Sequence, residues 1–335
     1  MPFIEDILKH KSLSIVGLEK NTGKTECLNY VLSRLKDCNV KVALTSIGID
    51  GETRDQVCQT PKPEVTVYEG MVFVTTEKHY KQKQLVSEIL DVSQRATSLG
   101  RLVTARAVTS GKVLISGSPE TAGLKLMIGK MNEIGIDLTI VDGALSRISL
   151  ASPAVTDAMI LATGAAVSAN IPQLVRKTKF LFDLINIEEV EAAVKEQFVG
   201  IEKGIWAIGN DGDIHDLGVA SAYMLEKARE DLFRFGTTIV VNGAITDKLL
   251  GHLKSQKNVK EITLIARDFT RIFATPEVYN AFIKKGGTLN VLQKTKLIAV
   301  CVNPTSPEGY VLDSEVLRRE MQQALQVPVY DVRQI

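Results

Sequence analysis

The pattern of apolar and polar positions predicts a chain of alternating strands and helices. Short runs of apolar, often β-branched residues indicate buried strands, and apolar residues spaced three and four apart indicate one face of a helix. The expected strands are 13–16, 40–47, 65–67, 71–75, 101–108, 112–117, 137–143, 157–164, 205–208, 237–242, 261–266, 288–292, 296–302 and 327–332. The expected helices are 1–12, 24–35, 83–94, 118–131, 172–185, 188–198, 275–286 and 313–325. Alternation at this frequency is typical of α/β proteins with largely parallel sheets.

The same pattern suggests a division into two domains. Two expected helices end before residues 199–203, and the rhythm restarts there with the strand 205–208. We therefore expect a first domain over 1–200 and a second, smaller α/β domain over 201–335. An Asn-Asp-Gly-Asp turn at 210–213 predicts a hairpin or sharp reversal in the second domain.

The most informative stretch is LSIVGLEKNTGKTECLNYVLSRL, residues 13–35. It predicts a buried strand, a loop bounded by Gly17 and Gly23, and then Lys24 and Thr25 at the start of a helix, which is the order of a phosphate-binding loop (P-loop). Backbone N–H groups and the helix dipole would hold phosphate, and Lys24 would add positive charge. The expected nucleotide-binding residues are Gly17, Asn21, Thr22, Gly23, Lys24, Thr25 and Glu26. The alternative is a strand-to-helix turn whose Gly, Lys and Thr serve only geometry and capping.

A magnesium nucleotide also needs oxygen ligands at neighbouring strand ends. Thr25 would supply a hydroxyl, and Asp142, which follows an apolar strand and precedes a glycine, would supply a carboxylate. Asp50, with Glu52, forms a second acidic candidate after the strand 40–47, at the kind of strand end where α/β sheets bind ligands. The expected metal ligands are thus Thr25, Asp50 and Asp142, and the expected catalytic residues are Lys24 and Asp142. The alternatives are that Asp142 caps a turn and that Asp50 and Glu52 lie in a solvated turn.

Two further features leave alternatives open. The polar segment 303–309, with two prolines after a buried strand, is either a binding loop or a rigid connection. The segment TIVDGAL at 139–145 resembles IVVNGAI at 239–245, which indicates either duplicated halves or two parallel strands ending in the same kind of turn.

Composition and charge restrict the partners. The formal net charge of the 335-residue chain is +1, which gives no reason to expect a nucleic-acid or membrane-surface partner. The amino-terminal residues lack an apolar core typical of signal peptides, and no stretch is long enough for a membrane span. The four cysteines form no CxxC pair, so we expect a cytoplasmic protein with reduced thiols. No Asn-Lys-x-Asp motif is present, and the choice between ATP and GTP stays open.

Residues 1–165 resemble the dethiobiotin synthetase-like branch of P-loop proteins. The resemblance depends on Gly17-x5-Gly23-Lys24-Thr25 and on Val141-Asp142-Gly143-Ala144, and it implies a P-loop NTPase-type sheet with helices on both faces. It also implies that Lys24 binds phosphates and that Thr25, Asp142 and Asp50 bind Mg²⁺. The chain departs from that enzyme where Leu44-Thr45-Ser46 replaces a lysine-proline pair, and dethiobiotin synthesis itself is not expected.

Over nearly its whole length the chain resembles the smaller, KamB-type reactivase subunit of lysine 5,6-aminomutase. The runs that carry this resemblance are GLEKNTGKTE, ALTSIGIDGE, VDGALSR, ILATGAAVSAN and VNPTSPEGY. It implies a nucleotide-dependent reactivation factor for an adenosylcobalamin- and pyridoxal-phosphate-dependent aminomutase, acting with a MutS-like ATPase subunit and with ATP or GTP hydrolysis coupled to remodelling of the partner. Three functions follow as hypotheses: this reactivase, a carboxylate-activating ATP-dependent enzyme, or a structural subunit whose P-loop does not hydrolyse nucleotide. The oligomeric state, including a homodimer, stays open.

Overall fold

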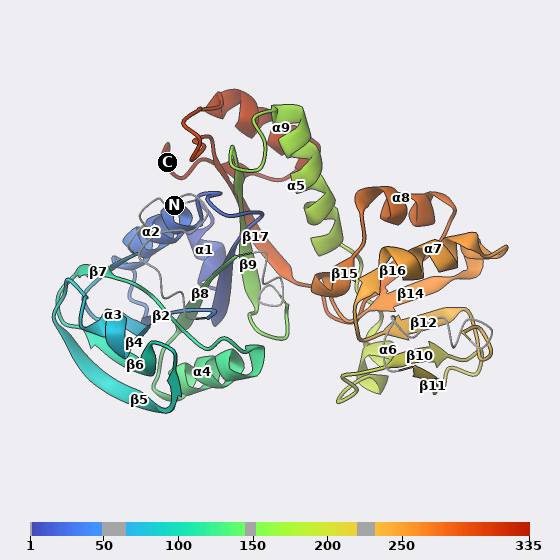
Figure 1. Cartoon of the computed structure of the whole chain (residues 1–335), viewed down its shortest axis with the longest axis horizontal. Helices are drawn as coiled ribbons and strands as arrows, with labels where there is room; N and C mark the ends of the chain where they lie inside the picture. The colour runs from blue at the N-terminus through green and yellow to red at the C-terminus, as the bar shows by residue number, and fades with distance from the viewer. Residues whose placement is uncertain (1, 49–64, 145–151, 220–231) are drawn as a thin grey trace. The chain divides into compact units, whose positions relative to one another are not determined.

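A nine-stranded sheet organises the first of two units into which the chain divides (Figure 1). The computed structural model describes residues 2–48, 65–144, 152–219 and 232–335. Unit 1 comprises Met1–Lys179 and Lys296–Ile335, and unit 2 comprises Phe180–Thr295. Both units contain helices and strands, which confirms the α/β class.

The large sheet is mostly parallel. Its strand order is β18-β17-β9-β1-β8-β2-β4-β6-β5. The neighbours from β18 to β4 pair in parallel, whereas β4, β6 and β5 pair antiparallel. The strands are β1 (Ser12–Gly17), β2 (Val42–Ser46), β4 (Val72–Thr76), β5 (Ser87–Thr97), β6 (Gly100–Ala107), β8 (Leu138–Ala144), β9 (Ala158–Gly164), β17 (Lys296–Asn303) and β18 (Val329–Tyr330). Two short strands, β3 (Val65–Val67) and β7 (Gly111–Val113), form a separate antiparallel pair.

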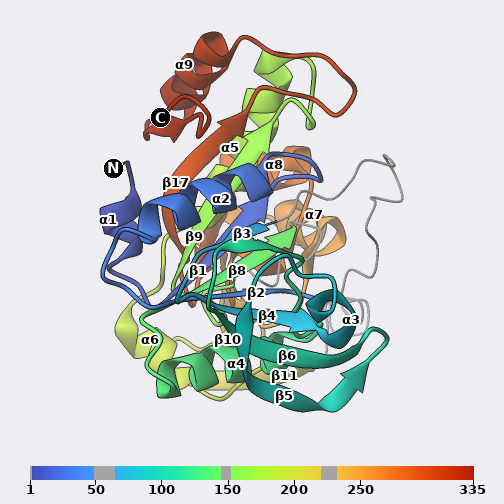
Figure 2. The same cartoon turned by 90° about the vertical axis from the view of Figure 1, so that its left-hand side faces the viewer.

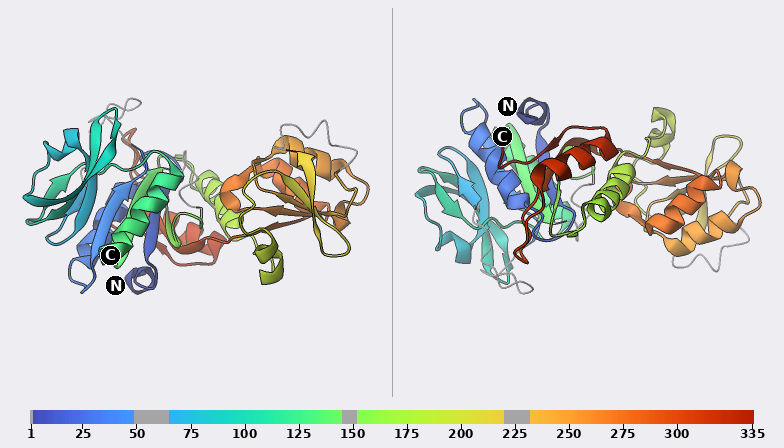
Figure 3. Two further views of the ribbon diagram at one scale, coloured as in Figure 1. Left: turned by 90° about the horizontal axis from the view of Figure 1, so that it is seen from below. Right: turned by 90° about the horizontal axis from the view of Figure 1, so that it is seen from above.

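Helices cover both faces of this sheet. Side chains alternate between the two faces of each strand, and the central strands β1 and β9 are buried at every position, so both faces need cover. The helices of unit 1 are α1 (Ile4–Ile7), α2 (Lys24–Leu35), α3 (Glu77–Tyr80), α4 (Thr121–Glu133), the first part of α5 (Ile171–Ile185) and α9 (Ser314–Leu325). On β8, Leu138 and Ile140 belong to the core with α2, whereas Val141 packs with residues of α4. Figure 3 shows α4 in front of the sheet from below and α2 in front from above.

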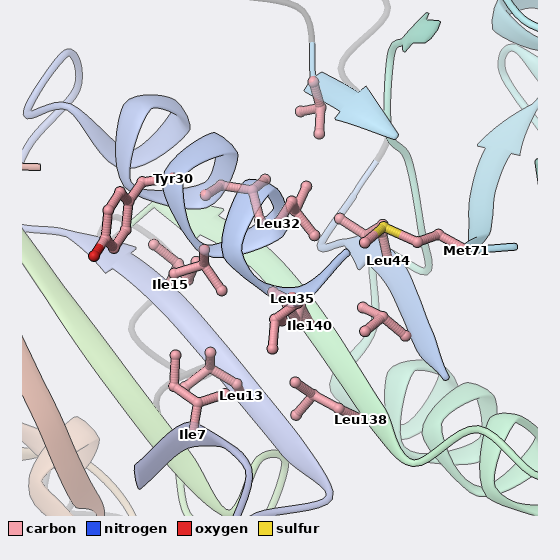
Figure 4. Packing of buried hydrophobic residues seen from close by; sticks show 14 of the residues in the cluster. Ile7, Leu13, Ile15, Tyr30, Leu32, Leu35, Leu44, Met71, Leu138 and Ile140 are labelled. Carbon is pink, nitrogen blue, oxygen red and sulfur yellow. The ribbon is translucent and has the colours of Figure 1, made fainter. Parts of the chain in front are cut away.

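The core beneath α2 fixes the helix that follows the glycine-rich loop. Leu32 and Leu35 of α2 pack with Leu13, Ile15 and Ile140 of the central strands, as Figure 4 shows. All five side chains are buried. Burying a side chain of this size stabilises a protein by about 1.5–3 kcal/mol, so the position of α2 over β1 and β8 is firmly held.

Unit 2 contains a smaller sheet of strand order β11-β10-β12-β14-β16. The hairpin predicted at 210–213 is confirmed, because β10 and β11 pair antiparallel on either side of it. The strands β12, β14 and β16 are parallel. The elements of this unit are β10 (Ile205–Ile208), β11 (Ile214–Val219), β12 (Thr238–Val241), β13 (Ile245–Thr246), β14 (Thr263–Ala266), β15 (Ile272–Phe273), β16 (Thr288–Val291), α6 (Ala192–Gln197), α7 (Asp247–Ser255), α8 (Pro276–Lys284) and the 3-10 helices Val259–Glu261 and Phe269–Arg271.

The division between the units differs from the expected boundary at 200/201. Residues 296–335 belong to unit 1, because β17 pairs with β9 along its whole length and β18 pairs with β17. Unit 2 is therefore inserted between two parts of unit 1. Hydrophobic periodicity indicates where strands lie, but it does not indicate which strands pair. The sequence therefore did not predict that residues 296–335 rejoin the sheet of unit 1.

The expected helix over 83–94 is wrong: from Ser87 onward this segment belongs to the edge strand β5. Its apolar residues fit a helical spacing, yet β5 pairs antiparallel with β6, with Ile89 opposite Ala105. Val86 and Ile89 are exposed, whereas Leu85 and Val92 are partly buried against the core, so the apolar residues of this segment do not form one buried helical face. Pairing with a neighbouring strand overrides a weak local preference.

No helix in the described ranges is both long and apolar enough to cross a lipid bilayer.

Candidate functional site

The loop between β1 and α2 has the backbone conformation of a tight, glycine-dependent turn (Figure 2). Asn21 and Gly23 both adopt left-handed conformations, with φ of 59° and 88°. The hydroxyl of the buried Thr22 donates a hydrogen bond of 2.9 Å to the carbonyl of Glu19 and closes the loop. At Gly17 a Cβ would lie 2.8 Å from Cγ of Lys24, so the lysine stem runs back over the end of β1.

Among the described residues, the consecutive backbone amides from Thr22 to Glu26 have no hydrogen-bond partner. The helix is capped by Gly23, which has no side chain to satisfy them. Unpaired amides and the positive end of the helix dipole together favour an anion at this position.

Two side chains of the first helical turn are also uncommitted. Among the described residues, the ammonium of Lys24 makes no hydrogen bond or ion pair, and the hydroxyl of Thr25 makes no hydrogen bond. Both residues are half-buried. They are therefore available to a ligand without first breaking an internal interaction.

Asp142 lies on the neighbouring strand, on the same face of the sheet as α2. It is two residues beyond Ile140, which packs under α2, and side chains two apart on a strand share a face. Its register partners are Ile15 on β1 and Ser46 on β2, so it stands near the carboxyl edge of the central strands. The structure thus brings Asp142 to the same face and edge as Lys24 and Thr25. Asp50, the other expected carboxylate, lies outside the described residues.

The end of β17 adjoins the loop from the opposite side. A Cβ at Gly23 would lie 2.7 Å from Cβ of Asn303, and one at Gly164 would lie 2.9 Å from the backbone N and C of Asn303. The following segment is held by hydrogen bonds from the amide of Ser306 to the carbonyl of Tyr310 and from the Tyr310 hydroxyl to the carbonyl of Ala165, at 2.9 and 2.6 Å. The predicted loop 303–309 is thus pinned beside the glycine-rich turn.

The side chain of Glu26, which was expected to contribute to nucleotide binding, pairs with Arg333 instead. Its Oε1 forms an ion pair of 2.7 Å with Nη2 of Arg333, so only its backbone amide is free for a phosphate. A small cavity of about 10 Å³ opens beside this pair. It is lined by Thr22, Gly23, Glu26, Cys301, Val302, Asn303, Asp331, Val332 and Arg333.

Two cysteines distant in sequence meet beneath the first turns of α2. Cys27 and Cys301 are both buried, and their sulfur atoms are 3.5 Å apart in a thiol–thiol hydrogen bond. That hydrogen bond and complete burial raise the pKa of the Cys301 thiol well above its ordinary value. The pair is a packing element, since both thiols are buried and the raised pKa of Cys301 opposes formation of its thiolate.

Alkylation should separate the cysteines by reactivity. We expect iodoacetamide at pH 8 to modify the partly exposed Cys38 of the native protein at least about tenfold faster than Cys27 or Cys301, because thiolate fraction and access set the rate. Peptide mass spectrometry over a time course measures the three rates, and guanidinium should equalise them. Labelling of native Cys301 as fast as Cys38 would contradict the buried pair.

The chemistry of the site fits a magnesium nucleotide. The unpaired amides and Lys24 suit phosphate oxygens, and the Thr25 hydroxyl and Asp142 carboxylate are the hard oxygen donors that Mg²⁺ prefers. No group of three or more potential His, Cys, Asp or Glu ligands occurs among the described residues.

Comparison of the chain with models of protein families, with curated proteins and with solved structures gave no match in any of the three. The site is therefore interpreted from its own geometry.

Several residues beside the site were not predicted from sequence. Arg333 and the Cys27–Cys301 pair are brought to α2 by the return of β17, far along the chain. Ser46 is placed beside Asp142 by the pairing of β2 with β8. No local pattern marks these residues, because their roles depend on strand order.

Proposed function

We propose that the chain binds a magnesium nucleoside triphosphate, ATP or GTP, in a P-loop formed by the end of β1 and the start of α2. The observation that carries this proposal is that, within the described part of the chain, neither the amides from Thr22 to Glu26 nor the neighbouring ammonium of Lys24 has a partner. Donors that are shielded from water are costly without a partner, and here Thr22 is buried while Lys24 and Thr25 are half-buried. A phosphate would supply the acceptor oxygens that these donors lack.

Each residue has a distinct role in this proposal. The amides of Thr22 to Glu26 bind phosphate oxygens, and Lys24 neutralises charge on the outer phosphates. Thr25 and Asp142 would hold Mg²⁺, which neutralises phosphate charge when bound. Gly17 and Gly23 are required because a Cβ at either position would meet Lys24 or Asn303.

The biological role that we propose is nucleotide-dependent reactivation of an adenosylcobalamin- and pyridoxal-phosphate-dependent aminomutase, together with a MutS-like ATPase subunit. Support comes from the sequence resemblance to KamB-type reactivase subunits. A reactivase must bind its partner differently with and without nucleotide, and this requires a ligand with differential affinity for two states. β2 ends in the neutral Ser46, near the place where dethiobiotin synthetase, which residues 1–165 resemble, has a lysine-proline pair; this difference favours a role directed at a partner.

A capture experiment tests this role. The immobilised chain is incubated with a cobalamin-damaged lysine aminomutase and the MutS-like subunit, with ATP, with GTP or without nucleotide, each in the presence of Mg²⁺. We expect nucleotide to change the apparent affinity for the partner by about tenfold, a coupling of about 1.4 kcal/mol. The Lys24→Ala chain should show no nucleotide effect.

Equal capture under all three conditions would contradict the reactivase role. It would not test nucleotide binding itself, which calorimetric titration measures. Metabolite-dependent nucleotide turnover without any partner would instead support an enzyme acting on a small carboxylate.

A further inference from the structure

Ser46, the last residue of β2, is the direct neighbour of Asp142 in the sheet. The parallel register pairs Ser46 with Asp142, and Asp142 with Ile15 of β1 on its other side. Adjacent strands lie about 4.8 Å apart, so the two side chains stand next to each other if they share a face.

The alternation along β2 shows that they do. Leu44 packs into the core beneath α2. Thr45 points the other way, since its hydroxyl is 3.4 Å from the carbonyl of Ser116 and 3.2 Å from the sulfur of Met127 on α4. Ser46 therefore faces the α2 side, as Asp142 does.

The backbone around Ser46 is held on both sides. The amide of Ile47 donates to the carbonyl of Asp142 at 3.1 Å, and the amide of Gly48 donates to the carbonyl of Ser118 at 3.0 Å. Gly117 lies so close that a Cβ there would be 3.0 Å from the carbonyl carbon of Ser46. The backbone from which the hydroxyl projects is thus held by the fold before any ligand binds.

The Ser46 hydroxyl itself is uncommitted. It forms no hydrogen bond in the described portion of the chain, and the residue is half-buried. A hydroxyl can both donate and accept, which suits a water that is bound to a metal and also contacts a carboxylate.

We propose that Ser46 is a positioning residue for Mg²⁺, holding, together with Asp142, a water of the metal's shell. This inference rests on the proposed nucleotide site. Mg²⁺ gives up its waters reluctantly and is usually held by few protein ligands, so groups that orient those waters contribute to its affinity. Partners of this outer kind typically change metal affinity by about 10–100-fold when they are removed.

The test compares Ser46→Ala, Ser46→Thr and Thr45→Val with the wild type. Calorimetric titrations with ATP and with GTP are made in chelator and at increasing Mg²⁺, and thermal unfolding confirms that each variant folds. We expect Ser46→Ala to bind nucleotide normally in chelator and to need about tenfold more Mg²⁺ for half-maximal tightening. Ser46→Thr keeps a hydroxyl and should retain the wild-type Mg²⁺ requirement.

Thr45→Val is the matched control, because it removes a hydroxyl from the same strand on the opposite face. An unchanged Mg²⁺ requirement in Ser46→Ala, or an equal shift in Thr45→Val, would overturn the assignment of Ser46 while leaving nucleotide binding intact. Weaker binding of Ser46→Ala in chelator would also overturn it, since the hydroxyl would then act on the nucleotide itself. Failure of the wild type to bind either nucleotide would refute the proposed site and Ser46's role with it.

Discussion

Lys24→Ala should weaken binding of ATP or GTP by about tenfold to a hundredfold and leave thermal stability nearly unchanged. A hydrogen bond to a charged group contributes about 1.5–3 kcal/mol, which corresponds to that range of dissociation constants. Stability should be kept because the Lys24 ammonium has no partner among the described residues, so its removal breaks no internal interaction. Calorimetric titration with Mg²⁺ present measures the affinity for each nucleotide and identifies the preferred base.

Lys125→Ala is the matched control for charge. Lys125 is an exposed lysine on α4 that has no ion pair within the described ranges. Its replacement removes the same charge far from the loop in sequence and should leave nucleotide affinity unchanged. If Lys24→Ala binds nucleotide as tightly as Lys125→Ala, the loop is kept for its shape and the chain is better interpreted as a structural subunit.

Phe282→Ala should lower the free energy of unfolding of unit 2 by about 3–5 kcal/mol. Phe282, on α8, is completely buried, and a Cβ at Gly287 would lie 2.8 Å from its Cδ2, which shows how tightly its ring is enclosed. Truncation leaves a cavity that the surrounding residues fill only in part. Trp206, the sole tryptophan, lies on β10 of the same unit, so its fluorescence during urea unfolding reports this transition.

Phe273→Ala provides the comparison within the same unit. Phe273 is 56% exposed on β15, and a surface substitution of this kind changes stability by about 0.5 kcal/mol or less. Similar losses in the two variants would show that the Phe282 ring is not enclosed as described.

The sequence predicts the parts of this protein that depend on neighbours along the chain. The strand, loop and helix around Gly17 and Lys24 occur as expected, because periodicity and glycine placement are local signals. The hairpin after β10 and the helices α5, α8 and α9 follow from similar signals. The segment 83–94 shows where local signals fail. The spacing of its apolar residues fits a helix, but its pairing with β6 makes it a strand.

Features that depend on strand order could not be predicted in this way. Asp142 was a candidate because an acid after an apolar strand is a recognisable pattern, yet its position beside Ser46 depends on the pairing of β8 with β2. The meeting of Cys27 with Cys301 and of Gly23 with Asn303 depends on the pairing of β17 with β9. The contacts of Cys27 with Cys301 and of Gly23 with Asn303 join residues hundreds of positions apart, and a periodic pattern carries no information about such contacts.

The split of unit 1 around unit 2 has a consequence for the order of folding during synthesis. Domains commonly fold as they emerge from the ribosome, beginning with the amino-terminal one. Here unit 2 is continuous in sequence, whereas the sheet of unit 1 gains β17 only after all of unit 2 has been made. The glycine-rich turn lacks its neighbour Asn303 until then, so we expect the nascent chain to complete unit 2 first and to acquire the proposed nucleotide site last.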